Sequence, residues 1–202
     1  MIDAIILAAG QGTRMKSNKA KVLHQLSGKS LLQHVVDAVN PLSASINIVI
    51  GYDAELVKHS ISNHAINWVV QKKQLGTGHA VQQVKTNIND KSTCIILYGD
   101  VPFISTNTIK SLIAQSQSTG FSLISVILDD PSGYGRIVRD KNNVIKSVIE
   151  QKDADDEKQK INEINTGIMA IKGSILKQYI SQLESNNKQG ELYLTDIVKI
   201  EV

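Results

Sequence analysis

A glycine-rich turn with nearby cations contains the residue types that best fit chemistry. Gly10 and Gly12 follow the apolar run 4–8, and Arg14 and Lys21 come shortly afterwards. A glycine turn at the carboxyl end of a buried strand presents backbone N–H groups that can hold phosphate oxygens. Arginine offers these oxygens a planar fork, and lysine offers a mobile point charge. We therefore interpret the two cations as phosphate ligands rather than as solvated surface charges.

Two common phosphate-binding patterns, one at this turn and one at residues 23–30, are excluded. The dinucleotide pattern G-x-G-x-x-G that begins at Gly10 needs a glycine at position 15, which is Met15. The sequence 28–30 resembles the end of a P-loop, but the required earlier glycine is replaced by Leu23. Neither a dehydrogenase nor a P-loop enzyme is predicted.

The elements that must position the turn alternate between strands and helices. Strands buried on both faces are indicated by apolar runs at 4–8, 46–50, 68–70, 94–97 and 123–128. Helical spacing appears at 31–39, 56–61, 80–84 and 105–113, the last with Ser105 as its N-cap. This alternation predicts an α/β fold, with a Rossmann-like, doubly wound, mainly parallel sheet and right-handed crossovers.

The alternation of strands and helices ends at residue 129, where consecutive strands are predicted instead. Turn-forming residues occupy 129–135, and two strand-like segments joined by a polar hairpin follow at 136–139 and 144–149. The charged segment 152–160 is interpreted as a loop or exposed helical turn. Further elements are expected as a strand at 164–171, a helix at 175–183 and the start of a helix at 194–198. The sheet should therefore be mixed, with a small antiparallel portion near 130–170.

Composition narrows the class of protein. The 22 basic and 19 acidic residues give a net charge of +3, which argues against a surface that coats nucleic acid. The single cysteine, Cys94, excludes a disulfide framework and fits a small core residue. The five histidines, His79 among them, lack metal-ligand spacing, so we expect them to be structural or exposed. No apolar run approaches the ~18 residues of a membrane helix, and the N-terminus lacks the basic region of a signal peptide. We expect a cytoplasmic protein without nucleic-acid or membrane partners.

Blocks of sequence along essentially the whole chain resemble the sugar-nucleotide pyrophosphorylases, a nucleotidyltransferase superfamily. The blocks, in order, are 7–15 with 21–23, 74–80, 97–102, 133–137, 163–168 and 190–196. Together they resemble the N-terminal uridyltransferase domain of the bacterial bifunctional N-acetylglucosamine-1-phosphate uridyltransferase/glucosamine-1-phosphate acetyltransferases. One block alone would be weak, but blocks in register are specific.

The resemblance implies a reaction. A phosphate oxygen of N-acetylglucosamine 1-phosphate would attack the α-phosphorus of UTP with Mg²⁺ as cofactor, and pyrophosphate and UDP-N-acetylglucosamine would form for cell-wall synthesis. It also implies one domain over 1–202, with a nucleotide-binding part at about 1–128 and a sugar-binding part at about 129–202.

The resemblance further implies roles for individual residues. Arg14 and Lys21 would be the catalytic cations, and Asp100 the magnesium ligand. Gln71 would bind uracil with backbone groups of Gly76 and Thr77. The implied substrate-binding residues are Leu7, Ala8, Ala9, Gly10, Lys21, Gln71, Gly76, Thr77, Tyr98, Gly99, Asp100, Gly135, Glu150, Asn165, Tyr193 and Thr195. From residue type alone, Asp100 could be a turn or N-cap residue, and Gln71 an ordinary polar residue at a strand end.

The sequence departs from the family pattern at two places. The family usually has proline before the lysine at position 21, where this chain has Ala20. A second magnesium contact, an asparagine beyond the last helix, has no counterpart before Val202, so we expect a C-terminally truncated domain without the trimerising β-helix. Two alternatives stay open: a weak or inactive nucleotide-sugar-binding homologue, and a nucleotidyltransferase for another sugar 1-phosphate.

Overall fold

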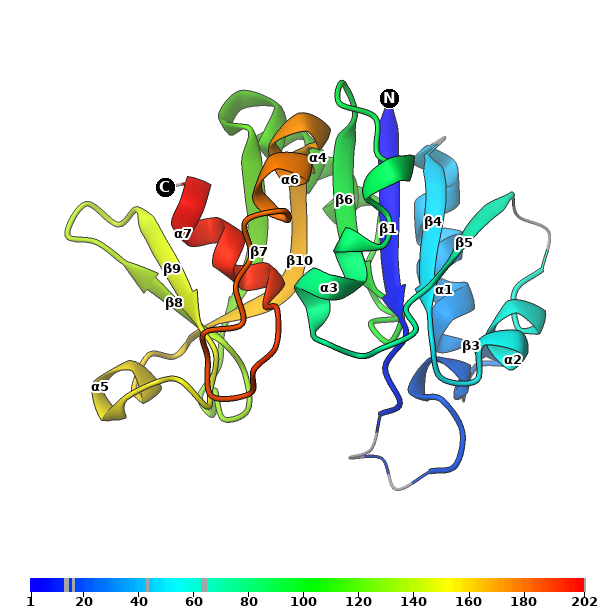
Figure 1. The fold of residues 1–202 in the computed structure, drawn as a ribbon, viewed down its shortest axis with the longest axis horizontal. Helices are drawn as coiled ribbons and strands as arrows, with labels where there is room; N and C mark the ends of the chain where they lie inside the picture. Colours follow the sequence, from blue (N-terminus) through cyan, green and yellow to red (C-terminus); the bar gives the residue numbers. More distant parts are fainter. Residues whose placement is uncertain (13–14, 16, 43, 63–64, 202) are drawn as a thin grey trace.

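A mixed sheet with helices on both faces forms the centre of the computed structural model (Figure 1). The structure describes residues 1–12, 15, 17–42, 44–62 and 65–201. Within them, eight strands form the main sheet in the order β5-β4-β1-β6-β10-β8-β9, with β7 paired to β10. Their bounds are β1 Ile2–Ala8, β4 Ser45–Ile50, β5 Ile66–Val70, β6 Thr93–Tyr98, β7 Phe121–Ile127, β8 Arg136–Arg139, β9 Ile145–Ile149 and β10 Glu163–Lys172. The mixed, mainly parallel α/β fold predicted from the sequence is confirmed.

Polar side chains cap three of the described helices. Ser105 accepts a hydrogen bond from the backbone N–H of Thr108 at the start of α4, as expected. Ser30 accepts one from Gln33 at the start of α1, and Asp155 accepts one from Lys158 at the start of α5. The α-helices are α1 Leu31–Val39, α2 Ala54–His59, α3 Thr77–Gln82, α4 Thr106–Thr119, α5 Asp156–Gln159, α6 Gly173–Tyr179 and α7 Ile197–Glu201. Short 3₁₀ helices are η2 Lys21–Leu23, η3 Asn40–Leu42, η4 Lys85–Asn87 and η5 Leu194–Asp196.

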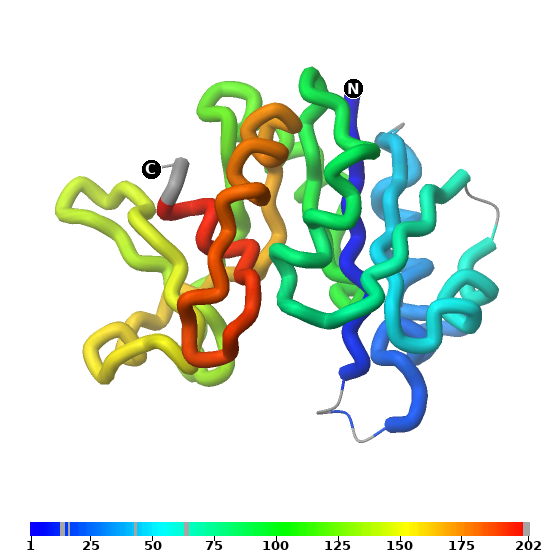
Figure 2. The backbone as a smooth tube through the Cα atoms, viewed as in Figure 1, coloured from blue at the N-terminus to red at the C-terminus, as the bar shows by residue number. Residues whose placement is uncertain are grey.

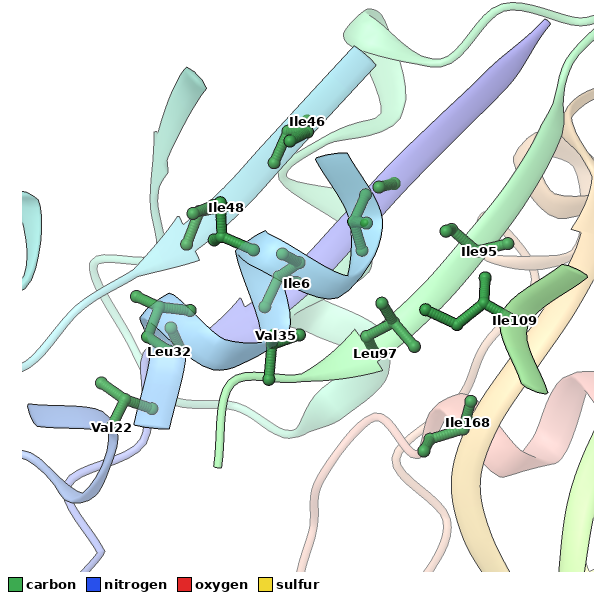
Figure 3. Packing of buried hydrophobic residues seen from close by; sticks show 14 of the residues in the cluster. Ile6, Val22, Leu32, Val35, Ile46, Ile48, Ile95, Leu97, Ile109 and Ile168 are labelled. Atoms are coloured by element: carbon green, nitrogen blue, oxygen red, sulfur yellow. The ribbon is translucent and has the colours of Figure 1, made fainter. Parts of the chain in front are cut away.

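The two faces of the sheet bury separate apolar clusters. On one face Ile6 packs with Leu32 of α1 and Ile109 of α4 (Figure 3). On the other face, Ile5 belongs to a cluster with Val81 of α3. Neighbouring residues of a strand point to opposite faces, so an unbroken apolar run such as β1 serves both clusters. This double burial fixes the carboxyl ends of β1 and β6 side by side, with Leu7 in register with Tyr98.

The antiparallel portion is larger than the sequence indicated. The run 123–128 was expected among strands buried on both faces, but β7 is antiparallel to β10 and Ile127 is 77% exposed. An apolar run does not distinguish parallel from antiparallel pairing, which explains the error. The helix expected at 175–183 ends at Tyr179. The strands β2 Gln25–Leu26 and β3 Lys29–Ser30 pair in a separate small sheet and were not predicted.

The C-terminal segment returns to the parallel part of the sheet. Figure 2 shows it running beside the chain just before and within α3. The backbone N–H of Gly78 donates to Leu192 at 2.8 Å, and that of Leu192 donates to Leu75 at 2.8 Å. The described part of the chain contains no helix with the length and apolar character needed to cross a membrane.

Gly167 lies where β10 changes register, and it allows close contact with Tyr98. Its φ is +79°, and a Cβ there would lie 2.4 Å from Cε2 of the Tyr98 ring. We expect Gly167→Ala to lower the free energy of unfolding by about 2–4 kcal/mol, from backbone strain and overpacking. Urea denaturation measures this. Gly133→Ala is the matched control, because its φ is +87° but nothing lies within 4 Å of the added methyl. Equal losses for both variants would contradict the proposed clash.

Candidate functional site

A cavity of about 560 Å³ opens at the carboxyl ends of β1 and β6. Ten predicted substrate-binding residues line it: Leu7, Ala8, Ala9, Gly10, Lys21, Gln71, Gly76, Thr77, Tyr98 and Asp100. Gly99 is adjacent, and its N–H donates to the Leu7 carbonyl at 2.9 Å. Arg14, the other predicted catalytic cation, lies outside the described residues.

Six lining residues were missing from the predicted set. They are Gly12, Met15, Val22, Gln74, Ala80 and Glu191. All of them fall inside the sequence blocks that carry the family resemblance, so those blocks contained the signal. Gln74 and Glu191 add two polar side chains to those of Lys21, Gln71 and Asp100 at this cavity.

The start and the end of the glycine-rich loop are held close together. Gly12 has φ +68°, and a Cβ there would lie 2.8 Å from the Lys21 Cβ, so only glycine fits without a shift. Ala20 has φ −53° and ψ 137°, which proline could also adopt, and its N–H donates to Asp53 Oδ2 at 3.0 Å. Proline lacks this donor. The departure from the family pattern therefore replaces a stiff residue with a hydrogen-bonded one, and Lys21 remains at the cavity.

Lys21 and Asp100 form an ion pair at this cavity. Lys21 Nζ lies 2.7 Å from Asp100 Oδ2, with side chains 41% and 25% exposed. An ion pair this exposed contributes about 0–1 kcal/mol to stability. Asp100 does not cap α4, since that role belongs to Ser105. Both side chains are thus available to a charged ligand, and stability alone does not account for their placement.

Tyr98 joins the glycine-turn region to the antiparallel portion. Burial raises the pKa of its hydroxyl well above the ordinary value, and the carboxylates of Glu150 and Asp100 raise it further, whereas a hydrogen bond with Thr77 acts in the opposite direction. The hydroxyl therefore stays protonated at neutral pH. Thr77 Oγ1 also accepts the Leu194 N–H at 3.1 Å, which ties the C-terminal segment to this point.

A second cluster brings together predicted sugar-binding residues. The Asn165 N–H donates to the Gly135 carbonyl at 2.8 Å, and a Cβ on Gly135 would lie 3.3 Å from Glu150 Oε2. Thr195 Oγ1 donates to Glu150 Oε1 at 3.0 Å. Asn165 Oδ1 accepts the Gly167 N–H at 3.1 Å. These four predicted residues therefore form one group. Tyr98 lies between this group and the cavity, because its ring contacts Gly167 and its hydroxyl interacts electrostatically with the Glu150 carboxylate.

Tyr193, the remaining predicted substrate-binding residue, is mostly covered by protein. Its hydroxyl accepts a hydrogen bond from Gln189 Nε2 at 2.6 Å, and the residue is 7% exposed. Burial raises the pKa of the hydroxyl, with Asp153 and Glu150 adding to the shift. Tyr193 is close to Glu150 but is mostly covered by protein, so its direct contact with a ligand remains a prediction.

The sequence model of the MobA-like NTP transferase domain family matches residues 4–146. The chain belongs to this family. It is 54% identical over 197 residues to the Bifunctional protein GlmU of Vesicomyosocius okutanii, an alignment that covers 98% of this chain and 44% of the relative. The chain thus spans less than half of that relative's length. The match confirms the resemblance to the bacterial bifunctional family and the nucleotidyltransferase class of enzyme.

Solved structures share the fold of this NTP transferase domain. A UDP-glucose pyrophosphorylase complexed with UDP-glucose has a TM-score of 0.75 at 21% identity, covering 100% of this chain and 87% of that chain. A putative glucose-1-phosphate thymidylyltransferase from Bacillus anthracis has a TM-score of 0.76 at 22% identity, covering 98% and 81%. The arrangement of strands is therefore that of known nucleotidyltransferases.

The donor set of this NTP transferase domain fits magnesium held jointly with a nucleotide. Among the described residues, no group of three or more His, Cys, Asp or Glu side chains could hold a metal ion. Asp100 supplies one partly exposed carboxylate at the cavity. Mg²⁺ typically takes one or two protein carboxylates and completes its shell with substrate phosphates and water. Asp100 therefore fits a shared cation better than a resident structural metal.

Glu150→Gln is expected to raise Tm at pH 8 but not at pH 4. Burial raises the pKa of Glu150 above its ordinary value of 4.5, and nearby Asp196 and Asp153 raise it further. A group with a raised folded-state pKa favours folding at low pH, and that contribution is lost as pH rises through the folded pKa. Glutamine carries no charge and keeps an oxygen for Thr195.

Calorimetric melts at the two pH values measure this effect. Glu157→Gln is the matched control, because that carboxylate is exposed and forms an ion pair with Lys160 at 2.7 Å. A Glu150→Gln variant less stable than the parent at both pH values would contradict the inferred burial penalty.

Proposed function

We propose that this chain transfers a uridylyl group from UTP to N-acetylglucosamine 1-phosphate, forming UDP-N-acetylglucosamine and pyrophosphate for cell-wall precursor synthesis. The observation that carries the proposal is the Lys21–Asp100 pair, 2.7 Å apart, in the same cavity as the glycine-rich turn. A reaction between two phosphate compounds requires a cation to stabilise the phosphate charge and a carboxylate to hold a metal ion, both beside the phosphate-binding turn. The 54% identity to a Bifunctional protein GlmU supports the choice of nucleotide and sugar.

The cavity would hold the nucleotide. Backbone groups from Leu7 to Gly10 would border the nucleotide, and Gln71 would face the base with Gly76 and Thr77, since these residues line the cavity. Tyr98, Gly99 and Asp100 would lie on the ribose and phosphate side. Lys21 would leave Asp100 for a phosphate oxygen, because a triphosphate carries more negative charge than one carboxylate. Arg14 is proposed as a second cation on the phosphates.

The cluster around Glu150 would hold the sugar phosphate. The Glu150 carboxylate can accept hydrogen bonds from sugar hydroxyls, while the Asn165 Nδ2 can donate to the acetamido oxygen. Asn165 Oδ1 already accepts from Gly167, which fixes the amide with its nitrogen outward. Gly135 and Thr195 complete this wall, with Tyr193 nearby.

The reaction needs no protein nucleophile. An oxygen of the sugar 1-phosphate forms a bond to the α-phosphorus, and the bond from that phosphorus to the bridging oxygen of pyrophosphate breaks. The protein would supply in-line positioning and charge stabilisation. Cys94 takes no part, because it is fully buried and burial raises its pKa to about 12. Mg²⁺ held by Asp100 would supply further neutralisation of phosphate charge.

The test measures pyrophosphate release from UTP with N-acetylglucosamine 1-phosphate, and with glucose 1-phosphate in parallel, at a Mg²⁺ concentration shown by titration to be saturating. We expect faster release with the N-acetylated sugar. Faster release with glucose 1-phosphate would assign another sugar to the site. Tight UDP-N-acetylglucosamine binding without any release would show a binding module, and the proposed activity would be wrong.

A further inference from the structure

Gln71 is held firmly at the end of β5. Its backbone N–H donates to the Ile50 carbonyl at 2.8 Å, and the residue is only 3% exposed. It nevertheless lines the cavity at the carboxyl ends of β1 and β6. A polar side chain that is nearly buried and still borders a cavity has few atoms that can reach a ligand, so its orientation decides what it recognises.

The hydrogen-bond partners of the Gln71 carboxamide determine its orientation. Nε2 lies 3.2 Å from the Gly76 carbonyl oxygen and 2.9 Å from His79 Nδ1. A carbonyl oxygen only accepts hydrogen bonds, so the group facing it must be the NH₂. His79 Nδ1 faces the same NH₂ and must therefore accept, which places the ring proton on Nε2.

Both hydrogens of the Gln71 NH₂ are thus used by the protein. Within the described residues, no donor contacts Gln71 Oε1, and this oxygen is not among the fully buried polar atoms that lack a partner. The oxygen therefore remains accessible at the cavity that the residue lines. Gln71 presents an acceptor, and not a donor, to a bound base.

We infer that His79 is a positioning residue that fixes the Gln71 carboxamide with its oxygen toward the cavity, and so selects a pyrimidine base that carries a hydrogen on N3. Uracil carries that hydrogen. Cytosine has the same size but a lone pair on N3, which would face the Gln71 oxygen and be repelled. This inference rests on the proposed function, because it assumes that the cavity binds a uridine nucleotide.

His79 adds to the effect of the Gly76 carbonyl, because that carbonyl engages only one of the two hydrogens of the Gln71 NH₂. With Nδ1 as a second acceptor, turning the Gln71 amide would break two hydrogen bonds instead of one. The Gln83 NH₂ donates to the His79 carbonyl oxygen at 3.1 Å and lies 3.2 Å from His79 Nε2. A neutral imidazole accepts at only one nitrogen. Nδ1 has the shorter contact, 2.9 Å to the nearly buried Gln71, so Nδ1 is the acceptor and Nε2 carries the proton.

The test compares UTP and CTP binding by calorimetry with Mg²⁺ present, which does not depend on turnover. The wild-type chain should bind UTP more tightly. His79→Leu, which removes the acceptor, should reduce the ratio of the two affinities by about tenfold, the usual effect of one hydrogen bond lost at a buried partner. His79→Asn, whose Oδ1 can replace Nδ1, should keep most of the ratio, as should Gln83→Leu.

Nitrogen NMR of the wild-type chain adds a measurement that needs no variant. Long-range ¹⁵N correlations of the His79 ring should show the proton on Nε2, and a proton on Nδ1 would overturn the inference. An unchanged UTP/CTP ratio in folded His79→Leu would also overturn it while leaving the proposed function intact. A wild-type chain that binds no uridine nucleotide would overturn both.

Discussion

Replacing Lys21 with alanine is expected to lower kcat/KM for UTP by about 100- to 1,000-fold, the usual effect of removing one preorganised group that stabilises the transition state. The side chain belongs to the cavity, 2.7 Å from Asp100, where charge would build up on the phosphates. Steady-state pyrophosphate release measures the effect. The fold should be little affected, because the pair is partly exposed.

Lys29→Ala is the matched control for this variant. Lys29 forms an ion pair of similar length with Asp37, at 2.6 Å, beside a different cavity. Its loss should leave kcat/KM within about twofold of the parent, as surface changes away from a site usually do. If Lys21→Ala retained the parent rate, Lys21 would have no catalytic role.

Replacing Asp100 with asparagine should lower kcat/KM by about 100-fold and raise the Mg²⁺ concentration needed for half-maximal rate. Asparagine keeps the shape and one oxygen but loses the charge that attracts a divalent cation. The free energy of unfolding should change by less than about 1 kcal/mol, because only a partly exposed ion pair is lost. Rates over a Mg²⁺ titration measure both effects.

Asp90→Asn provides the comparison for Asp100→Asn. Asp90 pairs with Lys177 at 2.7 Å, so the same chemical change breaks an ion pair of the same length outside the candidate site. Only the Asp100 variant should change the Mg²⁺ requirement. An identical Mg²⁺ titration for the parent and Asp100→Asn would exclude Asp100 as the magnesium ligand.

The parallel half of the fold could be predicted because burial on both faces leaves a strong pattern. The run that becomes β1 is apolar at successive positions, and Ile5 and Ile6 reach opposite clusters. The strand β7 has a similar run, yet its pairing with β10 depends on a partner about 40 residues later, which no local pattern shows. The two-residue strands β2 and β3 are too short for any periodicity.

The candidate site was predictable in its residue types but not in its contacts. Lys21 and Asp100 were both expected from the sequence, but their contact depends on β1 and β6 pairing with Leu7 beside Tyr98. His79 was expected to be structural or exposed, because a lone histidine without metal-ligand spacing gives no further signal. Its contact with Gln71 depends on the turn between β5 and α3, which only the structure shows.

The proposed function requires the glycine-turn cavity to bind the nucleotide. A titration of ¹⁵N-labelled protein with UTP and Mg²⁺, followed by amide NMR, measures this binding residue by residue. We expect the largest shifts at Ala8, Ala9, Gly10, Gly12, Lys21 and Asp100, which border this cavity. The larger cavity of about 650 Å³ beside Lys29, Gln33 and His59 supplies the internal comparison. Shifts confined to that second cavity, with the amides at the glycine turn unmoved, would show that the nucleotide binds elsewhere and that the proposed function is wrong.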